Sequence, residues 1–242
     1  MRVVLRRMAA WAPGLETPEA WQGWAAAPAP LRGDGVPDAR FLPAMLRRRC
    51  TPLSKILLKA AMEACNDEER SQVRTVFSSR HGSINESVGL LENVARAEKL
   101  SPAKFSHTVH NAQAGLYSIA TGNRQASTSL AAREDSFGCG LLEALGHLER
   151  APDRAVLAVM GDVPLDPVFA RLVEEPACAY AVALQLATGG EGPGFTLRVA
   201  PNPEPAPVPP WPPAVEFLRH WLVGTERFEI PTPRQRWCFA RS

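Results

Sequence analysis

An alternation of amphipathic helices with short apolar strands constrains this chain more than any other feature of its sequence. Segment 136–150 repeats leucine at helical spacing, which predicts an inward face made of Leu141, Leu142, Leu145 and Leu148. A continuous apolar run at 155–160 follows and ends at Gly161 and Asp162, as a buried strand does. A second helix is predicted from Pro52, ahead of an apolar strand at 73–77. Helices alternating with buried strands predict an α/β fold of βαβ units around a largely buried sheet.

The remaining segments complete one predicted domain that spans residues 1–242. The proline-rich stretch 11–43 is expected to be a loop that wraps across a surface, because proline removes backbone donors. An amphipathic helix is expected at 87–99, with Val88, Leu91 and Val94 spaced for one face. The other expected elements are a strand start at 1–4, a strand-like segment at 105–111, a helix at 112–121, strands at 125–130 and 177–186, an edge strand at 195–199, a proline-rich linker at 201–213, and a C-terminal helix at 214–222 followed by a tail.

Composition and charge exclude several classes of protein. The 242 residues are 45% hydrophobic and carry a net charge of only +2, which argues against a dedicated nucleic-acid binder. Five cysteines are scattered without ligand spacing, so we expect no disulfide framework, no metal and no cofactor. The basic N-terminus lacks a signal-peptide core, and no run approaches the roughly 18 apolar residues of a membrane helix. We therefore expect a cytoplasmic protein without membrane insertion.

One stretch, from Ser78 to Asn123, resembles a known family, most specifically in LSPAKFSHTVHNAQAG at 100–115. EALGHLERAPDRAVLAVMGD at 143–162, and later FLRHWLVG and RQRW, add to the resemblance. These strings resemble the N-terminal half of β-ketoacyl-ACP synthases. They are more closely similar to a shorter β-ketoacyl-synthase-like family found beside aryl polyene and related polyketide or fatty-acid genes. The resemblance implies a thiolase-like α/β fold, with a mixed sheet and helices on its faces.

In such ketosynthases the first half supplies a nucleophilic cysteine at a helix N-terminus, and the second half supplies two histidines. The thiolate holds the acyl chain, and the histidines assist malonyl decarboxylation. Counting back without gaps from AVLAVMGD at 155–162 places the cysteine position near Asp135, within Glu134, Asp135 and Ser136. A carboxylate there does not readily form a thioester, and chain-length factors similarly carry a polar residue in place of the cysteine. His220 is the only histidine after Asp162, and no His-Gly-Thr motif occurs there. We therefore expect both the cysteine nucleophile and the histidine pair to be lost.

Residues around this position allow alternative readings. Cys139 lies four residues later, so its use as the nucleophile would require the deletion of a helical turn. Inside the helix it would also lie away from the free amides that activate a thiol. Ser136 is the other alternative nucleophile. Asp135 or Glu134 is one candidate for a functional carboxylate that mimics a thiolate or malonyl group. The alternative is a plain N-cap, in which Asp135 or Ser136 bonds the first free amides of the helix.

Polar residues elsewhere give weaker signals. His107 and His110 lie three apart in the strand-like segment and should point to opposite faces, so a structural role is expected rather than metal binding. Asn111 belongs to a tightly packed segment that the resemblance places beside a dimer interface. A basic run consists of Arg47, Arg48 and Arg49. One interpretation is that it binds an acidic acyl carrier protein or the phosphate of its pantetheine arm. The other is that it is a solvated run of charges.

These features favour a partner subunit over an independent enzyme. The leading hypothesis is a non-catalytic subunit, similar to a chain-length factor, that forms a heterodimer with a full-length ketosynthase and completes its acyl tunnel or sets chain length. Half of a thiolase-type domain is also expected to expose an apolar face that a partner covers. Two alternatives stay open: a stand-alone acyltransferase or hydrolase that uses Ser136 or Cys139, and a structural protein that only stabilises a multi-enzyme assembly.

Overall fold

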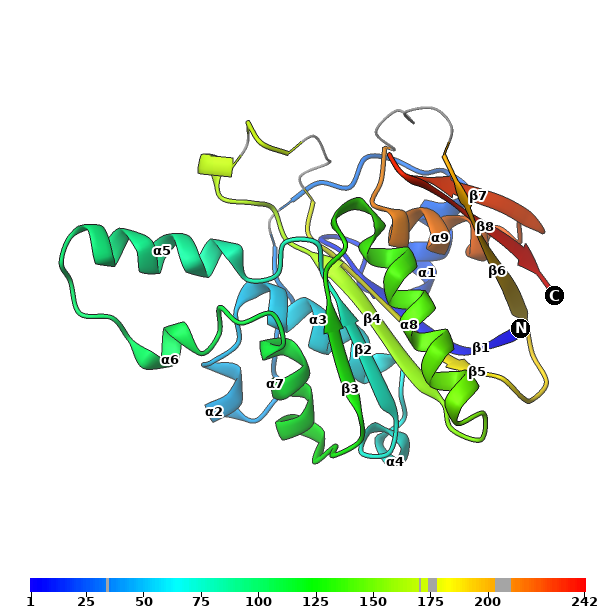
Figure 1. The fold of residues 1–242 in the computed structure, drawn as a ribbon, viewed down its shortest axis with the longest axis horizontal. Helices are drawn as coiled ribbons and strands as arrows, with labels where there is room; N and C mark the ends of the chain where they lie inside the picture. Colours follow the sequence, from blue (N-terminus) through cyan, green and yellow to red (C-terminus); the bar gives the residue numbers. More distant parts are fainter. Residues whose placement is uncertain (34, 170, 174–177, 203–209) are drawn as a thin grey trace.

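The computed structural model describes residues 1–33, 35–169, 171–173, 178–202 and 210–242. Its centre is an eight-stranded sheet with the strand order β3-β2-β4-β5-β1-β6-β8-β7 (Figure 1). The strands are β1 (Val3–Trp11), β2 (Arg74–Ser78), β3 (Ser127–Leu130), β4 (Val156–Asp162), β5 (Tyr180–Ala187), β6 (Gly194–Pro201), β7 (Arg227–Pro231) and β8 (Gln235–Arg241).

The sheet is mixed, as predicted. Strands β3, β2 and β4 pair in parallel, whereas every other pair of named strands is antiparallel. Both β4 and β5 are buried at every position, which explains why their sequences are unbroken apolar runs rather than alternating ones. The carboxyl ends of the three parallel strands meet at one edge of the sheet. Open α/β sheets place their functional loops at that edge.

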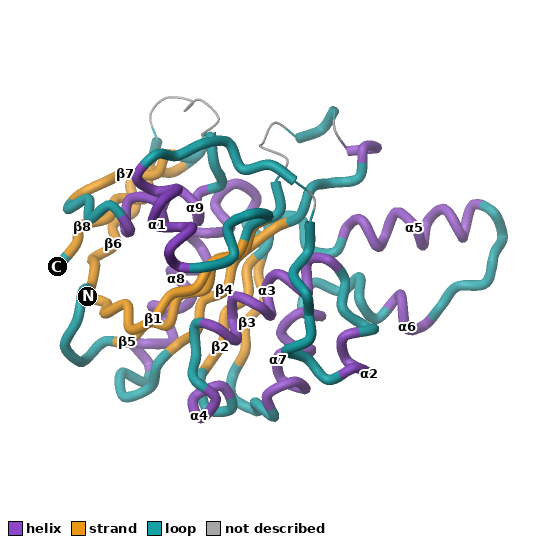
Figure 2. Tube along the Cα trace, turned by 180° about the vertical axis from the view of Figure 1, so that it is seen from behind, coloured by secondary structure: helices purple, strands orange, loops and turns teal. Residues whose placement is uncertain are grey.

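Helices cover both faces of the sheet and bury two separate hydrophobic clusters. One face packs against α1 (Pro18–Ala26), α8 (Ser136–Arg150) and α9 (Pro213–Leu222). The opposite face, turned toward the viewer in Figure 2, packs against α3 (Pro52–Glu63) and α7 (Ala112–Thr121). The remaining helices are α2 (Ala44–Arg47), α4 (Asp67–Arg70), α5 (Ile84–Ala95) and α6 (Pro102–Phe105). Within the described residues, no helix is long and apolar enough to cross a bilayer.

The two strongest helix predictions, α3 and α8, agree with the structure. Thr51 Oγ1 accepts a bond from the Ser54 amide at 3.1 Å, and Pro52 follows it at the first helical position, where proline needs no hydrogen bond. Helix α8 buries Leu141 and Leu148 as expected. The prediction is wrong for Leu142, which is 43% exposed because it lies about 100° around the helix from Leu141.

The N-terminal stretch is more regular than its prolines suggest. The predicted loop at 11–43 contains the helix α1, which begins after Thr17 with Pro18 at its first position. Thr17 Oγ1 caps this helix by accepting a bond from the Ala20 amide at 3.2 Å. Trp21 and Trp24 are then buried. Proline starts this helix instead of breaking it, because the first amides of a helix need no partner within it.

The prediction of a strand at 105–111 is wrong. Helix α6 ends at Phe105, and hydrogen-bonded turns carry the chain from there to α7. Ser106 Oγ donates to the Ala103 carbonyl at 2.7 Å, and Thr108 Oγ1 donates to the Phe105 carbonyl at 2.8 Å. Such local bonds from hydroxyl side chains satisfy backbone groups that a strand would offer to a neighbour, and therefore favour turns.

At the C-terminus the predicted helix α9 is followed by a β-hairpin rather than a loose tail. Strands β7 and β8 pair with each other, and β8 pairs with β6 along its whole length. Strand β6 therefore lies inside the sheet, so the prediction of an edge strand at 195–199 is wrong. In the predicted linker 201–213, Pro201 ends β6 and Pro213 begins α9, while residues 203–209 lie outside the described residues.

Residues 84–111, which we call the arm, project away from the sheet and carry α5 and α6 (Figure 1). Helix α5 agrees with the helix predicted here, but this chain leaves much of its apolar face uncovered: Leu91 is 67% exposed and Val94 is 58% exposed, whereas Leu90 is buried. Helical spacing identifies an apolar stripe on α5, but it does not reveal whether the chain itself covers that stripe.

Candidate functional site

The loops that follow the parallel strands meet at one edge of the sheet and form the candidate site. Strand β3 leads through a 3-10 turn, η1 (Arg133–Asp135), into the 15-residue helix α8. Asp135 therefore stands directly before the first residue of α8, at the position that counting assigns to the lost nucleophile. A helix N-terminus carries free amides and the positive end of the helix dipole, which stabilise either a thiolate or a carboxylate.

The carboxylate of Asp135 is buried and held by the C-terminal hairpin. Its Oδ1 accepts a bond from Thr232 Oγ1 at 2.6 Å and another from Trp237 Nε1 at 2.9 Å. Both donors are buried as well. Among the described residues, the Asp135 side chain makes no bond to the amides of α8, so the predicted side-chain N-cap is wrong. The carboxylate instead ties β8 and the turn before it to the start of α8.

The first turn of α8 is shaped to receive the indole of Trp237. A Cβ atom placed on Gly138 would lie 2.1 Å from Cε2 of that indole, so only glycine allows this approach. Trp237 is 1% exposed and belongs to the hydrophobic cluster beneath α8. The indole thus packs directly against the helix turn that follows Asp135.

Ser136 supports the turn before α8 and is already fully engaged. Its Oγ donates to the Arg133 carbonyl at 2.6 Å and accepts a bond from the Ala132 amide at 2.9 Å. Arg133 has φ = +55°, a left-handed conformation that costs free energy for a residue with a side chain. Ser136 closes this turn, and its geometry gives no support to a role as nucleophile.

Cys139 lies in the interior of α8, away from the free amides, as the sequence predicted. Burial, together with the charge of Asp135, raises the pKa of its thiol. A thiol whose pKa is raised is a poor nucleophile at neutral pH because little of it is ionised. The structure therefore gives no support to the alternative in which Cys139 carries an acyl group.

Glu134 joins two loops of the site. Its Oε1 forms an ion pair with Arg80 Nη2 at 2.7 Å, and both side chains are largely buried. Arg80 lies in the loop that follows β2, whereas Glu134 lies in the turn that follows β3. This pair therefore fixes the two loops against each other, which is a positioning role for Glu134.

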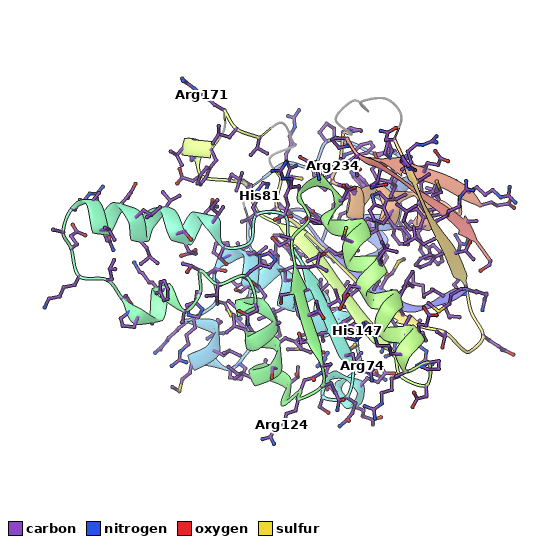
Figure 3. All side chains as sticks on the ribbon, viewed as in Figure 1. Arg74, His81, Arg124, His147, Arg171 and Arg234 are labelled. Carbon is purple, nitrogen blue, oxygen red and sulfur yellow. The ribbon has the colours of Figure 1, made fainter. Side chains whose placement is uncertain are left out.

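A second buried carboxylate, Asp162, ends β4 at the same edge. Its Oδ1 accepts bonds from Ser79 Oγ at 2.6 Å and the His81 amide at 3.1 Å, and its Oδ2 accepts one from the Arg80 amide at 3.0 Å. Burial raises the pKa of Asp162, and these hydrogen bonds oppose the rise. Asp162 thus organises the loop after β2. Figure 3 shows His81 at this edge, whereas His147 and Arg74 lie far from it, toward the opposite end of the sheet.

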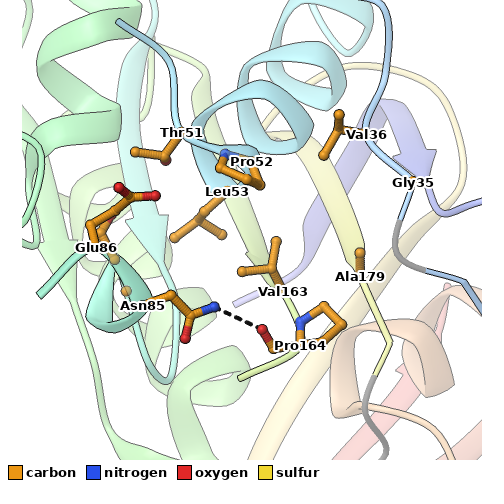
Figure 4. Close-up of a pocket in the computed structure, with 12 residues that line it drawn as sticks. Gly35, Val36, Thr51, Pro52, Leu53, Asn85, Glu86, Val163, Pro164 and Ala179 are labelled. Atoms are coloured by element: carbon orange, nitrogen blue, oxygen red, sulfur yellow. Dashed lines mark hydrogen bonds between the residues drawn. The ribbon is translucent and has the colours of Figure 1, made fainter. Parts of the chain in front are cut away.

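A cavity of about 180 Å³ lies on the α3 side of the sheet, at the base of the arm (Figure 4). Its wall is largely apolar, and Asn85 is fixed at its rim by donating from Nδ2 to the Pro164 carbonyl at 2.8 Å. Glu86 contributes the carboxylate drawn in Figure 4. The size and lining suit a small apolar group. The apolar part of the wall includes Val36, Leu53, Val163, Pro164 and Ala179.

The basic run lies at the surface and is separate from the Asp135 turn in sequence and fold. Arg47 ends α2, and Arg48 and Arg49 follow it with exposed side chains. Within the described residues, these three guanidinium groups make no ion pair closer than 4 Å with a carboxylate, which leaves them available to an acidic partner.

The predicted histidine pair lies in the turns between α6 and α7, not in a strand. His107 is half-buried, and His110 packs against Gly82, where an added Cβ would lie 2.8 Å from the His110 Nδ1. Asn111 precedes α7 without a side-chain capping bond. In the described part of the chain, no three His, Cys, Asp or Glu side chains are placed to hold a metal ion.

Thr232 and Trp237 are site residues that sequence reasoning missed. They lie 97 and 102 residues after Asp135, in a segment that the sequence identifies only as a tail. A buried tryptophan needs a partner for its N–H, and a buried carboxylate needs donors, but neither requirement indicates which residues will meet.

Comparison with known families gives one match that spans most of the chain. A family model described as "Beta-ketoacyl synthase, N-terminal domain" matches residues 21–240. A search of curated proteins found no match.

Several solved structures are similar to this chain. One is the ketosynthase ApeO in complex with its chain length factor ApeC from Xenorhabdus doucetiae. The match has 28% identity and a TM-score of 0.86, and it covers 99% of this chain and 99% of the matched chain. The AntDE:AntF complex, a type II PKS acyl-carrier protein with its ketosynthase, matches at 12% identity and TM-score 0.71, again over 99% of both chains. The ishigamide ketosynthase/chain length factor matches at 14% identity and TM-score 0.66, over 83% of this chain and 68% of the other. The last two likenesses show the thiolase-like fold alone.

Proposed function

The chain belongs to the β-ketoacyl synthase N-terminal domain family, and on this basis we propose that it is a non-catalytic subunit similar to a chain-length factor. In this role it pairs with a full-length, cysteine-bearing β-ketoacyl-ACP synthase. The pair elongates an acyl chain, and this subunit completes the acyl tunnel or limits the length of the product.

The proposal rests mainly on the position of Asp135 and on the hydrogen bonds that its carboxylate accepts. We assign the nucleophile position to this residue, and its Oδ1 accepts hydrogen bonds from Thr232 and Trp237. A carboxylate that accepts hydrogen bonds from two buried donors has a structural role. It cannot form a thioester with an acyl group, as a thiolate does. The framework of a ketosynthase is therefore retained around a position that cannot perform the covalent step.

The similarity to the ApeO–ApeC complex supports the pairing. At 28% identity over 99% of both chains, the matched chain is of nearly the same length as this one, and it comes from a complex of a ketosynthase with its chain length factor. The ketosynthase of Burkholderia phymatum is a longer chain, of which this one covers 59%, at a TM-score of 0.59. We extend the proposal to aryl polyene or related polyketide and fatty-acid systems because of the sequence resemblance.

Strand β3 offers a surface for the partner. It lies at one end of the sheet, so among the described residues no strand pairs with the backbone groups along its outer edge. Its four residues, Ser127–Leu130, include neither proline nor a charged side chain, which are usual protections of an exposed edge. A strand of the partner subunit can pair with this edge and extend the sheet across the interface.

The basic run gives a place for an acyl carrier protein. Carrier proteins present acidic helices, and guanidinium groups bind carboxylates and phosphates in bidentate geometry. We assign this contact to Arg47, Arg48 and Arg49, whose side chains lie at the surface beside α2. His110 and Asn111, near the base of the arm, are weaker candidates for contact with a partner.

Co-expression tests the proposal. The full chain carries a tag and is produced together with a cysteine-bearing ketosynthase from the same organism, and the expected result is a stable complex of one copy of each. The complex should elongate a carrier-bound acyl chain, while this subunit alone should not. A chain that stays monomeric and never associates with that ketosynthase would contradict the proposal.

Intact-mass measurement separates the proposal from an independent acyltransferase or hydrolase. After incubation with acyl-CoA or acyl carrier protein, this subunit should remain unmodified. A covalent acyl adduct that disappears in Ser136→Ala or Cys139→Ala would overturn the non-catalytic assignment.

The proposal also predicts that variants at Asp135 shift the chain length of the product made by the complex. An unchanged distribution of product lengths would favour a subunit that only stabilises the assembly.

A further inference from the structure

The cavity at the base of the arm has a buried floor and a rim that reaches solvent. Leu53 and Ala179 form the floor, and each is 1% exposed. On another side of the cavity Gly35 and Pro52 are exposed, and Val36 is 41% exposed. A small molecule can therefore enter from solvent and lose its contact with water at the floor.

The volume and the wall of the cavity fit one compact apolar group. At about 180 Å³ it is slightly larger than an engineered apolar cavity of about 150 Å³ that binds benzene. Its hydrocarbon wall, drawn in Figure 4, consists of Val36, Leu53, Val163, Pro164 and Ala179. A single hydrocarbon ring of about six carbons fills such a space, and the hydrophobic effect favours its burial there.

Two polar side chains that line the cavity retain unused hydrogen-bonding capacity. Ser83 is buried, and its Oγ accepts a bond from Gln113 Nε2 at 3.0 Å, but no described residue accepts the proton of its hydroxyl. Glu86 follows three positions later, and no described residue donates to its carboxylate. A ligand hydroxyl can satisfy both side chains, because it accepts one hydrogen bond and donates another.

The electrostatic surroundings favour a ligand without charge. The Glu86 carboxylate repels an anion. It attracts a cation, but the wall also includes Thr51, Pro52 and Leu53 at the start of the 12-residue helix α3, where the positive end of the helix dipole opposes a cation. Burial of either charge against an apolar wall also costs hydration free energy. An uncharged hydroxyl avoids these costs and still bonds to the carboxylate.

We propose that this cavity is a binding site for a compact neutral alcohol, a single hydrocarbon ring that carries one hydroxyl group. The ring packs on the floor, while the hydroxyl accepts from Ser83 Oγ and donates to Glu86. The site is separate from the turn at Asp135. Its floor belongs to the hydrophobic cluster on the α3 side of the sheet, whereas Trp237, which bonds Asp135, belongs to the cluster on the α8 side.

Titration of the full chain, followed by NMR of its backbone amides, tests the site. Cyclohexanol is the probe, and cyclohexylammonium and cyclohexanecarboxylate are charged analogues with the same ring. Cyclohexanol should shift the amide signals of Ala179 and Glu86 in a saturable way and bind at least about tenfold more tightly than either analogue. Absence of saturable binding, or equal affinity for the three compounds, overturns the site.

A cavity-filling substitution tests the position of the ring. Val163→Phe places a larger side chain in the wall and should weaken cyclohexanol binding at least about tenfold. Val168→Phe is the matched control, because Val168 is 64% exposed and is not part of the wall, and this variant should bind like the wild type. Val163→Phe with wild-type affinity contradicts the proposal.

A change of charge tests the hydroxyl and protects the experiment against misfolding. Glu86→Gln keeps the size of the side chain, and it should weaken cyclohexanol binding about threefold or more while strengthening the binding of cyclohexanecarboxylate. Misfolding would weaken both, so opposite changes identify a direct contact. Glu98→Gln, in an exposed part of the arm, should change neither affinity. Unchanged affinities in Glu86→Gln overturn the assigned contact, and no outcome of these titrations bears on the pairing with a ketosynthase.

Discussion

Asp135 receives hydrogen bonds from two side chains that follow it by 97 and 102 residues in the sequence. Sulfur is a weak acceptor, so a cysteine at this position would leave the Trp237 N–H and the Thr232 hydroxyl poorly satisfied. The carboxylate therefore anchors the C-terminal hairpin to α8. Under the proposed function, the same residue also stands in place of the nucleophile, which removes the acylation chemistry.

Removing this carboxylate should destabilise the chain. Asp135→Ala leaves two buried donors without their partner, so we expect the free energy of unfolding to fall by about 1–3 kcal/mol, measured by urea denaturation. Asp153→Ala, in an exposed turn, is the control and should change stability very little. Equal stability of the two variants would show that the hairpin does not depend on Asp135.

Asp162 predicts a pH dependence of stability. Burial raises its pKa in the folded chain above the ordinary value of 3.8, so the folded state binds more protons than the unfolded state between the two values. The stability contributed by this group is fully present below pH 3.8 and is lost as the pH rises through the folded pKa. Asp162→Asn removes this dependence.

Urea unfolding of the wild type and Asp162→Asn across a pH series checks this sign. The free energy of unfolding of the wild type, minus that of the variant, should decrease as the pH rises. A difference that increases with pH would mean that the bonds from Ser79, Arg80 and His81 outweigh the cost of burying the charge.

At the scale of elements, the contact of α8 with β8 depends on one glycine. Gly138→Ala would place a Cβ about 2.1 Å from the Trp237 ring, so the helix or the hairpin must move, and we expect a loss of about 1–3 kcal/mol in unfolding free energy. Gly146→Ala is the matched control in the same helix. Its Cβ meets nothing within 4 Å, so it should gain about 0.5–1 kcal/mol from helix propensity.

Thermal or urea unfolding of both glycine variants distinguishes packing from propensity. Opposite signs for the two substitutions would support a close approach of the indole at Gly138. A stabilising Gly138→Ala would instead mean that Trp237 does not pack against this turn in solution.

At the scale of the whole molecule, binding of the ketosynthase should protect β3. In the part of the chain that the structure describes, no strand lies beside the outer edge of β3, so pairing with a partner strand adds hydrogen bonds there. Hydrogen exchange followed by mass spectrometry should slow for peptides covering 127–130 on complex formation. Peptides covering 235–241 are the internal control, because β8 already lies between β6 and β7. Equal change in both regions would argue against β3 as the paired edge.

Local sequence patterns were sufficient to predict the central elements of the fold. Helices α3 and α8 and strands β2 and β4 follow from helical spacing, capping residues and unbroken apolar runs, each of which lies within a few residues of the element it specifies. The start of α8 at Ser136 was also predicted, because its leucine residues repeat at helical spacing from there onward. The resemblance to ketosynthases added the fold family, which the comparisons support.

Contacts between distant segments decided the rest. The pairing of Asp135 with Thr232 and Trp237 depends on the sheet bringing β8 beside α8, which no local pattern encodes. The apolar stripe of α5 was visible in the sequence, yet its exposure follows from the projection of the arm beyond the sheet. Periodicity identifies which face of an element is apolar, but tertiary structure decides whether another part of the chain covers that face.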